Sequence, residues 1–177
     1  MAVDHVKSTF VTNSDASPVV ANTAGEGGPA PLKTIDGYAT AVASSSADAT
    51  YQLCRIPSNA KVKRIIFESQ AQTAGKFDLG LYYATDGLGG KPTALLAAAA
   101  IDQDFFAAVI DCASAVLPTD VTNQSLTYTL AKRAQPIWQA VGLTSDPGGN
   151  FDIVATVKTT AVTTGTGLFG ISVSYTD

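Results

Sequence analysis

The side chains that could carry out chemistry are few in this sequence and lie far apart. The single histidine is His5, and the two cysteines, Cys54 and Cys112, have no histidine near them and form no Cys-x-x-Cys pair. A nucleophilic serine or cysteine needs a general base beside it, and a zinc site needs several histidine or cysteine ligands. We therefore expect no nucleophilic centre and no metal site, and we interpret both cysteines as small buried apolar residues in a reducing compartment.

Carboxylates are the remaining chemical resource. Residues 102–106, Asp-Gln-Asp-Phe-Phe, begin as a calcium loop does and then continue with two aromatic residues instead of oxygen ligands. We interpret Asp102 as the cap of a short helix. The apolar face of that helix would consist of Phe105, Phe106, Val109 and Ile110. A glycosidase-type carboxylate pair stays open. However, the only glutamates are Glu26, in a loop-like stretch, and Glu68, in a predicted strand, so we expect no catalytic residue and no cofactor.

Charge and composition weigh against several further classes of protein. Only 15% of the residues are charged, the net charge is −4, and the densest basic group is Lys61, Lys63 and Arg64, so we expect no nucleic-acid partner. The glycine-rich stretch 86–92 ends in Gly-Lys-Pro, whereas a phosphate loop needs Ser or Thr opening a helix, so a plain loop is predicted. The sequence contains no run of about 18 apolar residues, so no membrane-spanning helix is predicted. A signal-peptide pattern is also missing, which predicts synthesis in the cytoplasm without export by the usual route.

Residues 1–34 differ in composition from the rest and are predicted to form an extended N-terminal arm. Serine, asparagine, glycine, alanine and proline dominate residues 13–33, and Pro29 and Pro31 disfavour a helix there. Two short apolar patches interrupt this polar stretch; they consist of Phe10, Val11, Val19 and Val20. Because a merely disordered arm would not need such patches, we predict that the arm docks through them on its own domain or on a neighbour.

Residues 35–177 are predicted to form one mainly all-β domain. Alternating apolar and polar residues predict several strands, among them 61–69, 77–82, 151–158 and 168–175. We predict that the first two pair as an antiparallel hairpin and that the last two form another. A second short helix is expected to start at Pro136 and to end at Gly142, with Trp138 in the core. Six to eight strands with two short helices in their connections predict a two-sheet antiparallel β-sandwich, of which the jelly roll is one form.

Several stretches of the chain carry a resemblance to known proteins. They are residues 7–13, 16–20, 51–60, 77–82, 102–106 and 138–148. In their order along the chain they resemble structural proteins of tailed-phage virions, a class that includes capsid decoration (cement) proteins. The resemblance implies a component of the capsid exterior, made in the cytoplasm of a host bacterium. It further implies the major capsid protein as a partner and a homo-oligomer, a dimer or trimer.

Other functions stay open beside the cement protein. One is a head–tail joining protein or a tail or fibre component of the same virion. Another is a carbohydrate-binding sandwich, which would use Tyr82, Tyr83 and Trp138 as exposed aromatic side chains. The low charge content suits a docking protein, because ordering one Lys or Glu side chain costs up to about 2 kcal/mol of conformational entropy.

Overall fold

The computed structural model describes Pro18 and residues 31–41, 47–72, 75–84, 100–158 and 167–177. The strands formed by these residues are β1 (Lys33–Thr40), β2 (Thr50–Pro57), β3 (Lys61–Ser69), β4 (Lys76–Tyr83), β5 (Ala100–Asp111), β6 (Val116–Asp120), β7 (Asn150–Val157) and β8 (Leu168–Thr176). Between β6 and β7 lie two short helical segments, the 3-10 helix η3 (Lys132–Ala134) and the helix α2 (Ile137–Ala140).

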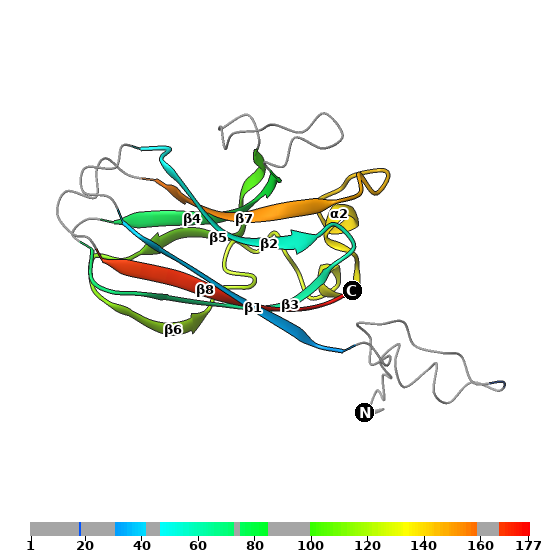
Figure 1. The fold of residues 1–177 in the computed structure, drawn as a ribbon, viewed down its shortest axis with the longest axis horizontal. Coiled ribbons are helices and arrows are strands. Elements are labelled where there is room, and N and C mark those ends of the chain that lie inside the picture. Colours follow the sequence, from blue (N-terminus) through cyan, green and yellow to red (C-terminus); the bar gives the residue numbers. More distant parts are fainter. Residues whose placement is uncertain (1–17, 19–30, 42–46, 73–74, 85–99, 159–166) are drawn as a thin grey trace, which may run out of the picture.

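The strands form two antiparallel sheets of four strands each, which lie face to face (Figure 1). Their orders are β1-β8-β3-β6 and β2-β7-β4-β5. Consecutive strands therefore alternate between the sheets at every step except from β4 to β5. Eight strands wound in this way between two sheets make a jelly roll. The predicted all-β sandwich is confirmed, and its form is the jelly roll.

The two predicted hairpins are wrong. Strand β3 lies between β8 and β6, whereas β4 lies in the other sheet between β7 and β5. Strands β7 and β8 are likewise in different sheets. Alternation along a strand identifies its two faces but not its neighbours, and a connection such as 70–75 is long enough to cross the roughly 10 Å between packed sheets.

The helix predicted after Asp102 is also wrong, because these residues belong to β5. Against β4, the register of β5 slips so that Ala107 faces Leu79 while Asp102 faces Leu81. Val109 follows with a φ of 54°. These bulges break the period of two, so the apolar residues of the strand fall at a spacing that imitates a helix face.

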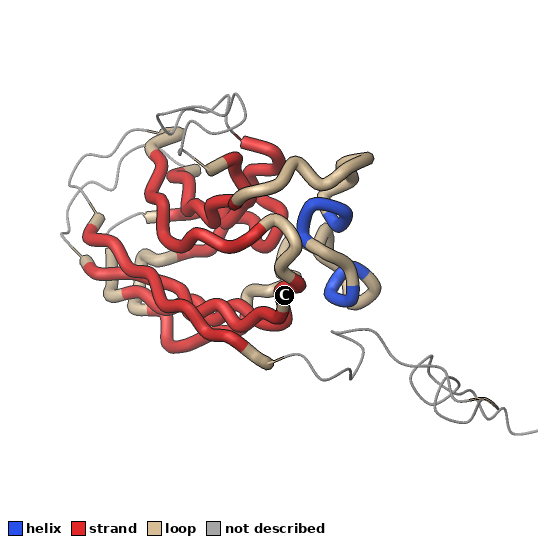
Figure 2. Tube along the Cα trace, turned by 45° about the vertical axis from the view of Figure 1, so that its right-hand side comes forward, coloured by secondary structure: helices blue, strands red, loops and turns tan. Residues whose placement is uncertain are grey.

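The second predicted helix is confirmed as α2. Pro136 is its N-cap, and Gly142 follows its end with a φ of 89°. The backbone N–H of Ile137 donates to the carbonyl of Ala60 at 2.8 Å, which fastens α2 to the β2–β3 connection at one end of the sandwich (Figure 2). Ile137 and Ala140 are the buried residues of α2, whereas Trp138, which we predicted in the core, is half-buried against it.

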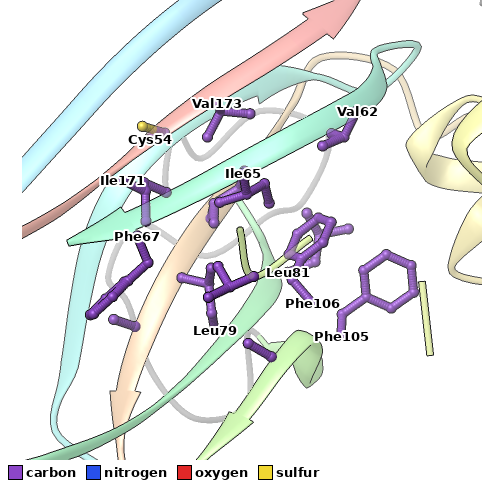
Figure 3. Close-up of a cluster of buried hydrophobic side chains, with 14 of the residues drawn as sticks. Cys54, Val62, Ile65, Phe67, Leu79, Leu81, Phe105, Phe106, Ile171 and Val173 are labelled. Carbon is purple, nitrogen blue, oxygen red and sulfur yellow. The ribbon is translucent and has the colours of Figure 1, made fainter. Parts of the chain in front are cut away.

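The core lies between the two sheets. Side chains from β3, such as Phe67, point toward Leu79 of β4 (Figure 3). Phe169 of β8 stacks on Phe77 of β4 with 4.7 Å between ring centroids. Tyr51 of β2 makes an edge-type contact with Phe169, with 5.2 Å between ring centroids. Burial of one such ring stabilises the fold by about 1.5–3 kcal/mol. These aromatic contacts across the interface hold the sheets together.

Candidate interaction surface

A groove of about 480 Å³ runs across the outer face of the β1-β8-β3-β6 sheet. Its position follows from the strand register. Gly170 of β8 faces Tyr38 of β1 on one side and Glu68 of β3 on the other. Tyr38 and Glu68 both point into solvent. Because Gly170 has no side chain, the sheet is hollow between them.

Glycine is required at position 170 by close approach of the backbone. A Cβ there would lie 2.6 Å from the carbonyl oxygen of Gly37 and 3.0 Å from the Cβ of Tyr38. The first of these distances is shorter than real Cβ contacts allow. Strand β1 therefore packs closely against β8 here, and no side chain rises from position 170 into the groove.

The groove exposes apolar side chains. Tyr38 is 77% exposed, Leu117 of β6 is 79% exposed and Leu168 of β8 is 42% exposed. All three line the groove, together with Ile66 and Pro118. Exposed apolar residues scattered singly are ordinary, but a concave group of them typically marks a contact surface.

The charged groups of the groove are of one sign. Among the described residues that line it are the carboxylates of Asp36 and Glu68, and none is a lysine, arginine or histidine. Asp36 of β1 faces Ser172 of β8, two residues along from the pairing of Tyr38 with Gly170. The surface therefore has an apolar centre with acid groups beside it.

The outer face of the β2-β7-β4-β5 sheet holds an ion pair with a buried carboxylate that sequence reasoning missed. The side chain of Asp152 on β7 is fully buried. Its oxygens accept hydrogen bonds from Arg55 Nε at 2.7 Å and from an Arg55 terminal nitrogen at 3.0 Å. Gln52 donates a further hydrogen bond to it. Because both donors lie on β2, the buried carboxylate ties β2 to β7, which is a structural role.

A second buried carboxylate on this face holds the irregular strand β5. Asp78 Oδ1 accepts the backbone N–H of Val109 at 2.8 Å, and Lys158 Nζ lies 2.8 Å from Asp78 Oδ2. Val109 is the β-branched residue with a positive φ, a conformation that costs free energy unless its surroundings enforce it. The hydrogen bond to Asp78 helps to hold Val109 in this conformation. In the sequence, Asp78 is a carboxylate inside the alternating segment 77–82, and alternation alone places it on the polar face of that strand.

The residues singled out from the sequence as arm contacts lie outside the part of the chain that the structure describes. They are Phe10, Val11, Val19 and Val20. The same holds for His5, Glu26 and the stretch 86–92. Their predicted roles stay predictions.

The predicted aromatic residues of a carbohydrate site do not form an exposed platform. Tyr82 is 1% exposed, and its hydroxyl forms a hydrogen bond of 2.8 Å with Thr156 Oγ1 on β7. Tyr83 packs against Phe151 with 5.9 Å between ring centroids, and Trp138 is half-buried. A sugar ring stacks on an open aromatic face, so this part of the carbohydrate hypothesis is wrong.

The two cysteines and the neighbouring carboxylates of β5 are the remaining residues that could carry out chemistry. Both cysteines are free and buried, as predicted, and burial raises the pKa of Cys54 to about 12 and that of Cys112 to about 11. Asp102 and Asp104 lie together in β5, where burial, followed by a hydrogen bond with Asp104, raises the pKa of the Asp102 carboxyl group. The described residues hold no group of three or more His, Cys, Asp or Glu suited to a metal ion. Nor does any helix among them have the length and apolar character to cross a membrane.

Comparison with known proteins places the fold among phage capsid chains. No protein-family model and no curated protein matches the sequence. A chain in the cyanophage Pam1 capsid asymmetric unit superposes with a TM-score of 0.50, at 13% identity, over 92% of this chain and 96% of that one. A chain in the capsid of Ralstonia phage GP4 superposes with a TM-score of 0.57, at 10% identity, over 83% of this chain and 84% of that one. The chain therefore shares its overall fold with chains of two phage capsid structures.

Proposed function

We propose that this protein is a structural component of a tailed-phage virion, and specifically a capsid decoration (cement) protein that binds the shell of major capsid protein and stabilises it. The observation that carries this proposal is the fold shared with chains of two phage capsids, over 92% and 83% of this chain. The resemblance of the sequence to tailed-phage structural proteins supports the same class.

The physical properties of the chain suit a protein that works through contact area. A jelly roll has both of its sheets fastened by one core, so it transmits force as a rigid body. The low charge content reduces the entropy lost when surface side chains become ordered at an interface. The exposed groove on the β1-β8-β3-β6 sheet offers apolar surface for such a contact.

The predicted arm would extend this contact to a neighbouring subunit. Strand β1 starts at Lys33, whose Nζ lies 2.6 Å from an Asp177 carboxylate oxygen, so the chain enters the sandwich at a defined point. A segment as long as residues 1–30 could reach at most roughly 100 Å if it were fully extended. We propose that Phe10, Val11, Val19 and Val20 contact the major capsid protein, and that the copies on the shell associate as dimers or trimers.

Cryo-EM of virions with and without this protein tests the role directly. In the phage that encodes the chain, deletion of its gene should remove density from the outside of the capsid, and the mutant heads should release DNA at a lower temperature. Loss of density at the head–tail junction instead would assign the chain to the joining proteins. Absence of the chain from purified particles would refute a virion role altogether.

A truncated protein tests the arm. Because β1 begins at Lys33, the deletion should span residues 1–30 and leave the strand complete. We expect the truncated protein to melt as the full chain does and to lose binding to capsids that lack the decoration protein. Binding equal to that of the full chain would show that the arm makes no contact that matters.

A further inference from the structure

The two outer faces of the sandwich differ in how much of them is open. Outward-pointing residues of β4 and β7 are buried; they are Asp78, Tyr82, Asp152, Val154 and Thr156. On the β1-β8-β3-β6 sheet, by contrast, Tyr38 and Leu117 are more than three-quarters exposed. Among the described strands, the second face therefore has more apolar surface left to cover than the first, where Val109 of β5 is 45% exposed.

We propose that the groove on this face docks an extended segment of the capsid shell protein in which an apolar side chain stands two positions from a lysine or arginine. This inference rests on the proposed function, and it adds a second contact beside the arm. The apolar part of the groove is formed by Tyr38, Leu117 and Leu168, and its charged part by Asp36 and Glu68. A cation on the partner would complement these carboxylates, and neither carboxylate pairs with a described lysine or arginine.

The spacing of the proposed motif follows from the strand register. Gly170 faces Tyr38, and two residues further along β8, Ser172 faces Asp36. Residues two apart on one strand point to the same side and lie about 6.8 Å apart. A partner segment that runs along β8 would therefore place one side chain over Gly170. The side chain two residues further along the segment would lie over Ser172, beside Asp36. The first position favours an apolar side chain and the second favours a basic one.

Charge favours a different protein over a second copy of this chain as the occupant. The chain has a net charge of −4, so a second copy would bring further negative charge to an acidic groove. Tyrosine is enriched among the residues that dominate binding energy at protein interfaces, especially beside a pocket that excludes water. We therefore assign Tyr38, which faces Gly170, as the main contact and Asp36, which faces Ser172, as the group that selects a basic partner.

Substitutions in the groove can be compared with a matched control. Leu117 is 79% exposed and lines the groove, whereas Leu130 is 78% exposed and does not. Tyr38→Ser, Leu117→Ser and Asp36→Lys should each weaken binding to capsids that lack the decoration protein by tenfold or more. Leu130→Ser should bind as the wild type does. All four side chains are exposed, so the variants should melt within a few degrees of the wild type.

Photo-crosslinking then identifies what occupies the groove. With benzoylphenylalanine in place of Tyr38, irradiation of the protein on capsids should yield crosslinked peptides of the major capsid protein with an apolar residue two positions from Lys or Arg. Crosslinks to a second copy of this chain, to a glycan, or to capsid peptides without that motif would overturn the inference.

The binding assay separates the inference from the proposed function. If the wild type binds capsids and the groove variants bind equally well, the groove is not a docking site while the cement role stands. Equal losses in the groove variants and in Leu130→Ser would also overturn it, because the effect would not belong to the groove. If the wild type does not bind at all, the cement role itself is wrong, and the groove as a capsid contact falls with it.

Discussion

Replacing Gly80 with alanine should destabilise the sandwich through a single added methyl group. The slipped register of β5 brings its backbone over Gly80, where a Cβ would lie 2.2 Å from the carbonyl oxygen of Gln103 and 2.4 Å from that of Asp102. Real Cβ atoms stay beyond 3.0 Å, so the two backbones must separate by 3.0 − 2.2, or 0.8 Å. Overpacking costs about 1–3 kcal/mol, and a backbone cannot yield by changing rotamer, so we take the upper end.

The net effect is smaller because alanine also restricts the unfolded chain. That restriction stabilises by about 0.4–1 kcal/mol, which leaves a net loss of about 2 kcal/mol. For a chain of this length, 1 kcal/mol shifts the melting temperature by about 2–4 °C, so Gly80→Ala should melt about 4–8 °C lower. Scanning calorimetry and far-UV circular dichroism both measure the shift.

Gly75→Ala is the matched control for this prediction. It removes the same freedom from the unfolded chain, but its nearest contact is the Cβ of Gln72 at 3.1 Å. We expect it to melt within about 2 °C of the wild type. If Gly80→Ala melted in the same interval as Gly75→Ala, the bulged part of β5 would not cross β4 as closely as we describe, and the reasoning would be refuted.

Three further predictions concern the core and its polar groups. Because burial raises the pKa of Cys54 to about 12 and that of Cys112 to about 11, both thiols should stay unreactive toward Ellman's reagent at mildly alkaline pH until the protein unfolds; fast reaction of the native protein would contradict their burial. Arg55→Met leaves the buried Asp152 carboxylate without its main cation and should cost about 1–3 kcal/mol in urea unfolding, at the low end because Arg55 is 39% exposed; an unchanged midpoint would refute the structural role of the pair. Phe169→Ala removes the ring that stacks at the sheet interface and should cost about 3–5 kcal/mol, and a loss below 1 kcal/mol would show that the sheets do not depend on it.

Strand positions were predictable because a half-buried strand repeats every two residues. The predicted segment 61–69 coincides with β3, the segment 168–175 is one residue shorter than β8, and the segment 151–158 is shifted by one residue from β7. Strand partners were not predictable in this way. A hairpin is the simplest reading of two neighbouring strands, whereas in a jelly roll most neighbours in sequence lie in opposite sheets.

Strand β5 shows where the period itself fails. Phe105, Phe106 and Ala107 are consecutive and all buried, so no alternation remains to identify a strand. The bulges that cause this are stabilised from another strand, by Asp78, through its hydrogen bond to Val109. Local sequence does not carry that long-range contact, and a helix was therefore the more natural local interpretation.

The groove could not be predicted from the sequence for a related reason. Tyr38, Glu68, Leu117 and Gly170 come from four different strands, and what makes them a surface is the order β1-β8-β3-β6. Until that order is known, an outward Tyr38 and a central glycine are separate and unremarkable positions. Once it is known, the glycine becomes informative, because it marks a point in the lining of the groove, between an aromatic ring and a carboxylate, from which no side chain rises. The search for contact surfaces in jelly rolls of this kind should therefore start from glycines on central strands whose outward neighbours are exposed.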